Sequence, residues 1–375
     1  MRSRTRRSTR MLVVAVTALA VSSSGLQPVN TTVDCDTIWR RTGSGWYESN
    51  PSYTDSRDDT ADWQFSIPEA QGMNSRALTS GLNSLRANKS ILSAIVIRHG
   101  KIVTESYYNG STRFRSNNVH SASKGMIQAL LAIAVQKGYI TSLDDKVSKY
   151  LPRYPNGAQI SLRNLISMAS GLRWEEDSTE YKIRMRSDWV GAALSQGFQS
   201  TPGTRFTYST GNTHVLSGVL QAATGMSTCA FADTNLFTPL EITPEHWGRD
   251  PQAIFAGGYN LYMTPRELAK FGLLYLQNGV WKGTQLVPTW AITDATTTLW
   301  QVDDTFSYSQ GWWNQTVSGH KMYFGWGHGG QFLYVIPSLD IVFTTTEYTA
   351  DGHDNIEINS REFIQNSLIP AVTGP

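Results

Sequence analysis

Strand-like segments lie at both ends of this chain, and helical patterns fill the middle. Near the beginning, two apolar runs at 93–99 and 102–108 are joined by a short turn, which predicts a hairpin. Near the end, four more apolar runs predict strands over 309–314, 322–326, 332–336 and 341–346. Strands from the two ends have to pair if their apolar side chains are to be buried. We therefore expect an α/β (α+β) fold in which one lobe is built from both ends of the chain.

Most of the remaining chain has helical spacing. The run from Thr264 to Glu267 places a Thr cap, a Pro at the first position and a Glu in the first turn, which is typical of a helix start. Other helices are predicted over 73–87, 162–168, 187–194, 212–223, 231–237 and 355–368. We expect the α/β lobe to comprise about 66–115 and 250–375, with a mainly helical lobe of about 116–249 inserted into it.

The first 25 residues have the pattern of a secretory signal peptide. Five arginines precede an apolar run from Met11 to Val21, and small residues follow that run. The run is too short to span a bilayer comfortably, so no stable membrane anchor is expected. Residues 26–65 are polar and irregular, which favours an N-terminal extension. We expect a secreted or periplasmic protein, exported by the general secretory route.

Composition excludes some classes of partner. The whole chain has a formal charge of +2, but the signal segment alone holds five arginines and no acidic residue. The remainder is slightly acidic, so nothing indicates a nucleic-acid face. Seven histidines show no ligand spacing, and neither a metal nor another cofactor is expected. The two cysteines, Cys35 and Cys229, could pair in an exported chain or remain as thiols, and their spacing does not decide between the two.

Ser121-Ala122-Ser123-Lys124 is the strongest candidate for chemistry. Residues i and i+3 share a helix face, so the Ser121 hydroxyl and the Lys124 amine are expected to meet. A serine needs a neighbouring base to become a nucleophile, and burial or a helix N-terminus can make a lysine that base. Ser121 could instead be only a helix N-cap, and Ser318 to Lys321 fits the same pattern without a helix after it. The stretch after Ser121 is predicted to be helical, because one helix face would carry the apolar residues Met126, Ile127, Leu130, Leu131, Ala134 and Val135.

Two further segments complete a family pattern. Tyr208-Ser209-Thr210 follows the first motif, and Gly327-His328-Gly329-Gly330-Gln331 precedes a predicted strand. With these motifs in this order, the chain resembles the class C β-lactamase-like serine hydrolases, which include penicillin-binding proteins, family VIII esterases and 6-aminohexanoate-oligomer hydrolases. The resemblance covers roughly residues 65 to 370. It implies a β-lactamase/transpeptidase-like fold, with an antiparallel sheet flanked by helices and an inserted helical lobe.

The resemblance also implies roles for individual residues. Ser121 would be the nucleophile and Lys124 its general base. Tyr208, as a phenolate or as a hydrogen-bond partner, would carry the proton to the leaving group and later activate water. The backbone N–H groups of Ser121 and Gln331 would form an oxyanion hole, with Gln331 on an edge strand. Gly329 and Gly330 would let the backbone approach the substrate.

Departures from the family pattern restrict the substrate. Thr210 stands where β-lactamases have Asn, so an amide donor to the substrate is lost. His328-Gly329 replaces Lys-Thr, which removes a permanent charge and a hydroxyl that would hold a substrate carboxylate. An esterase or amidase acting on a small ester, amide or short peptide-like substrate is favoured over a β-lactamase. The alternative is a catalytically degenerate sensor or binding protein. The oligomeric state stays open.

Some residues have structural alternatives. Tyr208 could be a core tyrosine, and His328 could be a packing residue on a strand. His120 is expected to point away from the nucleophile. An aromatic set near the third motif could line an apolar pocket or belong to the core between strands: Trp312, Trp313, Tyr323 and Trp326.

Overall fold

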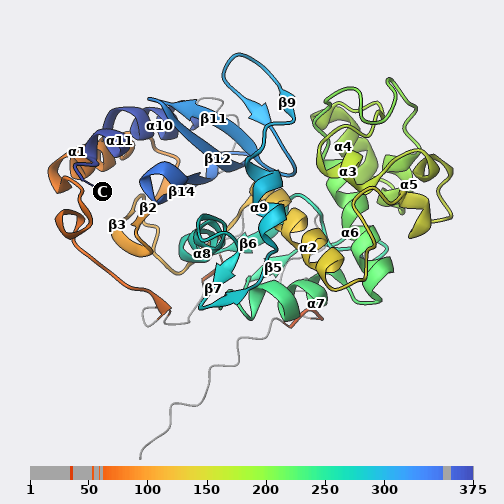
Figure 1. The fold of residues 1–375 in the computed structure, drawn as a ribbon, viewed down its shortest axis with the longest axis horizontal. Coiled ribbons are helices and arrows are strands. Elements are labelled where there is room, and N and C mark those ends of the chain that lie inside the picture. Colours follow the sequence, from red (N-terminus) through yellow and green to blue (C-terminus); the bar gives the residue numbers. More distant parts are fainter. Residues whose placement is uncertain (1–33, 37–52, 55–58, 60–61, 349–355, 375) are drawn as a thin grey trace, which may run out of the picture. The chain divides into compact units, whose positions relative to one another are not determined.

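The computed structural model describes residues 34–36, 53–54, 59, 62–348 and 356–374 (Figure 1). The predicted signal peptide and most of the predicted extension lie outside these residues. An eight-stranded antiparallel sheet is built from both ends of the chain, as predicted, in the order β3-β2-β14-β13-β12-β11-β10-β9. Its strands are β2 Ile91–Arg98, β3 Lys101–Tyr107, β9 Trp300–Gln301, β10 Ser307–Tyr308, β11 Trp313–Val317, β12 His320–Gly327, β13 Gln331–Ile336 and β14 Ile341–Glu347.

Helices cover both faces of this sheet (Figure 1). Alternate residues of β2 belong to different cores: Ala94 and Val96 pack with α1 and the C-terminal helices, whereas Ile95 and Ile97 pack on the side of α8. That alternation is the period of a strand that is buried on both faces. The helices concerned are α1 Ser75–Leu85, α8 Pro265–Leu276, α10 Ile356–Phe363 and α11 Ile369–Ala371.

The middle of the chain is mainly helical, and two of its helices begin within the nucleophile and tyrosine motifs. Lys124 is the first residue of α2, and Thr210 is the first residue of α6. The helix α4 was not expected, because Ile183 is its one buried residue and it therefore shows no apolar period. The α-helices of this region, with α9 beyond it, are α2 Lys124–Gln136, α3 Leu162–Ile166, α4 Glu176–Arg184, α5 Trp189–Leu194, α6 Thr210–Thr224, α7 Thr228–Ala232 and α9 Thr289–Thr296.

Smaller elements complete the fold. The strand predicted over 309–314 is broken, because Ser309 donates its backbone N–H to Trp312 O and closes a turn between β10 and β11. The short strands are β1 Tyr53–Thr54, β4 Arg115–Asn118, β5 His246–Trp247, β6 Leu261–Met263, β7 Val280–Trp281 and β8 Thr284–Gln285. Short 3₁₀ or π turns are η2 Pro68–Gln71, η3 His120–Ser123, η4 Val147–Lys149, η5 Pro155–Ala158, η6 Asp233–Phe237, η7 Pro337–Leu339 and η8 Ile364–Leu368.

No single helix among the described residues has both the length and the apolar character needed to cross a membrane. One pair, α6 with the helical stretch Thr228–Phe237, meets those limits jointly but is bent by 77°.

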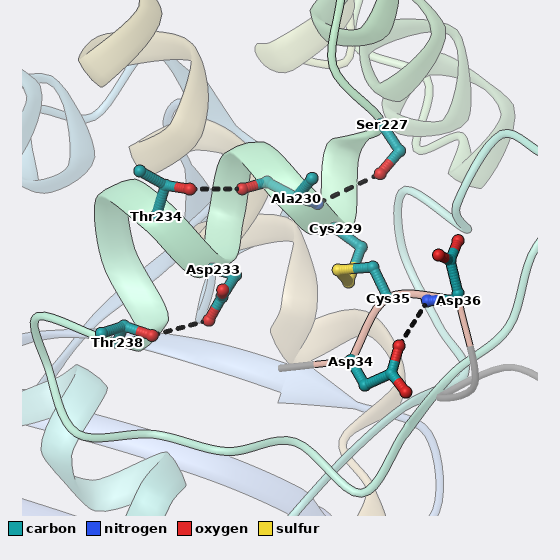
Figure 2. The surroundings of a disulfide bond; sticks show 9 residues. All are labelled: Asp34, Cys35, Asp36, Ser227, Cys229, Ala230, Asp233, Thr234 and Thr238. Atoms are coloured by element: carbon teal, nitrogen blue, oxygen red, sulfur yellow. Dashed lines mark hydrogen bonds between the residues drawn. A yellow bond between two sulfur atoms is a disulfide. The ribbon is translucent and has the colours of Figure 1, made fainter. Parts of the chain in front are cut away.

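Cys35 and Cys229 form a disulfide (Figure 2). Their Cα atoms are 5.8 Å apart, within the usual range for a disulfide. Cys229 lies on α7, whose N-terminus is capped by Ser227 through a hydrogen bond from Ala230 N. The bond therefore ties a short segment of the N-terminal extension to a helix that lies 194 residues further along the chain.

Candidate active site

The nucleophile motif begins on a sharp turn between β4 and α2. His120 has a φ of 44°, a left-handed conformation that a residue with a side chain adopts at some cost. Its backbone N–H is held by Asn118 Oδ1 at 3.0 Å. This turn brings Ser121 onto the first turn of the helical segment, where it lines a cavity.

Lys124 is buried beneath Ser121. Only 1% of its surface is exposed. Its Nζ lies 2.8 Å from Ser121 Oγ, 2.9 Å from Thr210 Oγ1 and 3.4 Å from Gly258 O. These three oxygens match the three N–H bonds of a lysine ammonium. The structure thus brings together the serine and the lysine that the sequence motif singles out, and adds two further oxygen partners for the lysine.

Tyr208 stands over the same lysine. Lys124 Nζ lies 5.0 Å from the centre of the Tyr208 ring. Burial, the largest influence, raises the pKa of Tyr208 above its usual value; the nearby charge of Lys124 lowers it, and that of Glu176 raises it. Tyr208 therefore carries its proton at neutral pH, which makes it a donor rather than a phenolate base.

Glu176 is a member of the site that the sequence interpretation missed. Its carboxylate accepts hydrogen bonds from the Thr210 hydroxyl, from Thr210 N at 2.9 Å and from Trp174 Nε1 at 2.7 Å. The available signal was the charge pattern of α4, which has Glu176 and Asp177 in its first turn and Lys182 and Arg184 in its last. Thr210 consequently faces Lys124 and Glu176, and its hydroxyl already has a partner on each side.

These residues surround a cavity of about 420 Å³. One wall is aromatic, formed by Tyr208, Trp313 and Trp326. Much of the polar lining comes from α4. The complete lining is Asn118, His120, Ser121, Glu176, Asp177, Glu180, Arg184, Tyr208, Thr210, Gly258, Tyr259, Asn260, Trp313, Trp326 and His328.

The third motif contributes to the cavity through one of its predicted residues. His328 lines it, whereas Gly329, Gly330 and Gln331, all among the described residues, lie outside its lining. The glycines form the β12–β13 turn: Gly330 N bonds to Gly327 O, and Gly329 has a φ of 76°, as the third position of a type II turn requires. The turn therefore gives Gly329 a conformational reason of its own, and the expected close approach of these glycines to a substrate stays a prediction.

The expected position of Gln331 on an edge strand is wrong. Its strand β13 lies between β12 and β14 in the sheet. Its side-chain amide donates to Glu347 O on β14 at 2.7 Å, and 1% of the residue is exposed. Strand β12 packs more extensively against the nucleophile turn than β13 does.

His120 and the aromatic residues also differ from expectation. His120 does not point away from the nucleophile: it lines the cavity, and its ring meets that of His328 edge-on at 5.6 Å. Burial, together with the nearby His328, lowers the pKa of His120 to about 3, so the ring is neutral. The aromatic set divides: Trp313 and Trp326 line the cavity, whereas Trp312 and Tyr323 are buried in the core.

Among the described residues, no group of three or more His, Cys, Asp or Glu side chains is arranged to hold a metal ion. The cavity does bring together a serine, a lysine and a tyrosine, with Lys124 Nζ near both Ser121 Oγ and the Tyr208 ring, and these are side chains that can support nucleophilic catalysis.

Comparison with known proteins identifies the same family that the motifs indicate. A family model described as Beta-lactamase matches residues 86–357. This range contains Ser121, Lys124, Tyr208 and His328.

Individual relatives are distant. An uncharacterised protein of Alkalihalophilus pseudofirmus is 28% identical over 225 residues, which are 52% of this chain and 61% of that protein. A teichoic acid D-alanine hydrolase of Staphylococcus aureus is 26% identical over 165 residues, 38% of this chain and 41% of the relative. The matched regions thus span less than two thirds of these relatives. A Bacillus anthracis structure, provisionally assigned as a 6-aminohexanoate-dimer hydrolase, shares the fold with a TM-score of 0.70 and 18% identity, covering 84% of this chain and 89% of that one.

Proposed function

Because this chain belongs to the β-lactamase family, we propose that it is an exported serine hydrolase that cleaves an ester or amide bond through an acyl-enzyme on Ser121. One observation carries the proposal. A lysine that is 1% exposed lies 2.8 Å from Ser121 Oγ, and the serine itself lines a cavity of about 420 Å³. Burying a lysine is costly, and three oxygen partners are needed here to offset that cost. A lysine held in this way beside a cavity-lining serine favours a chemical role.

The proposed acylation moves one proton through the site. Lys124, in its amine form, takes the hydroxyl proton as Ser121 Oγ forms a bond to the substrate carbonyl carbon. When the tetrahedral intermediate collapses, Tyr208 gives its proton to the leaving oxygen or nitrogen and receives the one that Lys124 holds. In deacylation a water takes the place of the leaving group, its proton follows the reverse route, and Ser121 regains its hydroxyl.

The negative charge that develops on the carbonyl oxygen needs donors. We assign these to the backbone N–H groups of Ser121 and His328. His328 lines the cavity directly after β12, and β12 packs against the nucleophile turn. Two such donors typically contribute several kcal/mol to the stability of the transition state.

The charges of the cavity favour a substrate without a carboxylate next to the scissile bond. Glu176, Asp177 and Glu180 all line it. Arg184 also lines it but forms an ion pair with Glu180. A β-lactam carries a carboxylate near its reactive bond, and that group would face a wall with more acids than bases. Esters and linear amides avoid this repulsion.

Export has independent support in the Cys35–Cys229 disulfide. Disulfides persist in oxidising compartments and are rare in the cytosol. A secreted or periplasmic location therefore fits both the predicted signal peptide and this bond.

Labelling with a fluorophosphonate probe tests the proposed function. The purified protein and its Ser121→Ala variant would be incubated with the probe and measured by intact mass. We expect one adduct on the wild type and none on the variant, since only an activated serine reacts readily. Turnover would then be compared on p-nitrophenyl butyrate, a linear p-nitroanilide and nitrocefin, with the ester or the anilide expected to be cleaved fastest.

Each outcome separates the candidate functions. No adduct on folded wild-type protein would favour a degenerate ligand-binding relative. An adduct without measurable turnover of any substrate would favour a sensor that remains acylated. Faster cleavage of nitrocefin than of both linear substrates would contradict the proposed substrate preference.

A further inference from the structure

We propose that Glu176 is a positioning residue that acts through Thr210 to keep the lone pair of Lys124 directed at Ser121. The inference rests on the proposed function, because it concerns how Lys124 serves as the base. It starts from a chain of contacts: the Glu176 carboxylate, the Thr210 hydroxyl, Lys124 Nζ and Ser121 Oγ follow one another at hydrogen-bond distance.

The single hydroxyl proton of Thr210 determines which atom donates and which accepts in each of these hydrogen bonds. A threonine hydroxyl has a single proton to donate, whereas an ionised carboxylate can only accept. The Thr210 proton therefore points to Glu176, and Thr210 Oγ1 must accept from Lys124 at 2.9 Å. Glu176 thus determines which partner of this contact is the donor.

The same reasoning applies to the N–H bonds and the lone pair of Lys124. Its amine form has two N–H bonds and one lone pair. Two partners, Thr210 Oγ1 and Gly258 O, are acceptors. Once both N–H bonds are engaged there, the lone pair is left for the hydroxyl proton of Ser121, which lies 2.8 Å away. Without Glu176, the Thr210 hydroxyl can rotate and donate to Lys124, in competition with Ser121.

Glu176 is itself fixed in place. Its carboxylate accepts a hydrogen bond from Trp174 Nε1 at 2.7 Å, and from Thr210 N, the first backbone N–H of α6, at 2.9 Å. A carboxylate at a helix N-terminus is stabilised by the helix dipole. These contacts hold the carboxylate in a defined orientation, which a positioning role requires.

Other titratable groups surround Lys124. Tyr208 approaches it from the segment before α6, Glu180 from α4 and His120 from η3. Glu180 is paired with Arg184, and His120 is neutral above about pH 3. Glu176 differs from these three groups, because its carboxylate is joined to Lys124 through the shared hydroxyl of Thr210.

Three variants test the inference: Glu176→Gln, Thr210→Val and Thr210→Ser. The rate of Ser121 labelling by the fluorophosphonate probe and kcat/KM for p-nitrophenyl butyrate would be followed from pH 5 to 10. We expect Glu176→Gln and Thr210→Val to lower both by about 10-fold to 100-fold, a part of what a well-placed base contributes. Thr210→Ser, which keeps the hydroxyl, should restore the rate to within about threefold of wild type.

The pH profile separates positioning from a structural role. Glu176→Gln removes a negative charge from the site, so the acidic limb of the pH profile should move to lower pH while the maximal rate falls. Loss of stability alone would lower the melting temperature without moving that limb. Glu175→Gln, at an exposed neighbouring carboxylate, is the matched control and should leave rates and profile unchanged.

Wild-type rates in both Glu176→Gln and Thr210→Val would overturn the inference, and so would a rate loss in Thr210→Ser as large as in Thr210→Val. Should Glu176→Gln fail to fold, the two Thr210 variants decide the question. Failure of the proposed function looks different, because then the wild-type Ser121 itself takes no probe.

Discussion

At the residue scale, the site depends on which groups hold protons. Burial raises the pKa of Tyr208 and lowers that of His120 to about 3, so both rings are uncharged at neutral pH. Neither ring therefore adds a charge beside Ser121. The neutral phenol also has a proton available for the leaving group, which a phenolate would lack.

Replacing Tyr208 by Phe tests that assignment. The variant keeps the ring that packs at 5.6 Å against Trp313 but loses the hydroxyl, so we expect the fold to persist while kcat falls by about 10²-fold to 10⁴-fold. Steady-state kinetics and thermal melting would measure the two effects. The raised Tyr208 pKa keeps the phenol protonated as pH rises to 9, so wild-type activity should show no loss there from this group. A variant with near-normal kcat would remove Tyr208 from the mechanism.

At the element scale, the nucleophile turn and β12 approach each other at two glycines. A Cβ on Gly325 would lie 3.1 Å from Ala122 Cβ, and one on Gly327 would lie 2.3 Å from Val119 O. The second distance is impossible for a real side chain, so either β12 or the nucleophile turn would have to move. Glycine at these positions therefore allows the end of β12 to lie beside Ser121.

Gly327→Ala should displace the end of β12 from the nucleophile turn. We expect Ser121 labelling by the fluorophosphonate probe to slow by about 10-fold or more, since a shift of about 1 Å at a catalytic group can cost 10²-fold. Gly197→Ala, where an added Cβ has nothing within 4 Å, is the control and should react at the wild-type rate. Equal rates in the two variants would mean that the position of β12 does not govern reactivity.

How far the sequence predicts these elements depends on what carries the signal. The strands β2, β13 and β14 are buried throughout and each contains a continuous apolar run (94–97, 332–336 and 341–343), so pattern alone located them. The helix α4 has one buried residue, Ile183, and its evidence was confined to charges at its two ends. The turn after Gly327 decides whether His328 or Gln331 faces the cavity, and apolar periodicity carries no information about that turn.

At the scale of the whole molecule, residues distant in sequence meet at one cavity. The motif at Ser121 and Lys124 could be predicted because its spacing is local. Glu176 could not, since its partner Thr210 is 34 residues away and their contact exists only once α4 packs beside the start of α6. Long-range partners of this kind are what tertiary packing adds to a local pattern.

The disulfide acts at the same scale. Cys35 and Cys229 are separated by 194 residues, and the loop that they close contains Ser121, Lys124 and Tyr208. Restricting so long a loop in the unfolded chain typically stabilises the folded state by about 2–4 kcal/mol. Neither cysteine lines the cavity, so the bond should influence stability far more than catalysis.

The double variant Cys35→Ser/Cys229→Ser should therefore unfold at a lower urea concentration and melting temperature, while kcat/KM at 25 °C stays within about twofold of wild type. Adding a reductant should destabilise the wild type and leave the variant unaffected. Ser227→Ala, which removes the cap of the same helix α7 but keeps the disulfide, is the matched control; it should cost about 1 kcal/mol and remain as sensitive to reductant as the wild type. A double variant as stable as the wild type would mean that the packing of α7, and not the covalent bond, holds this part of the molecule together.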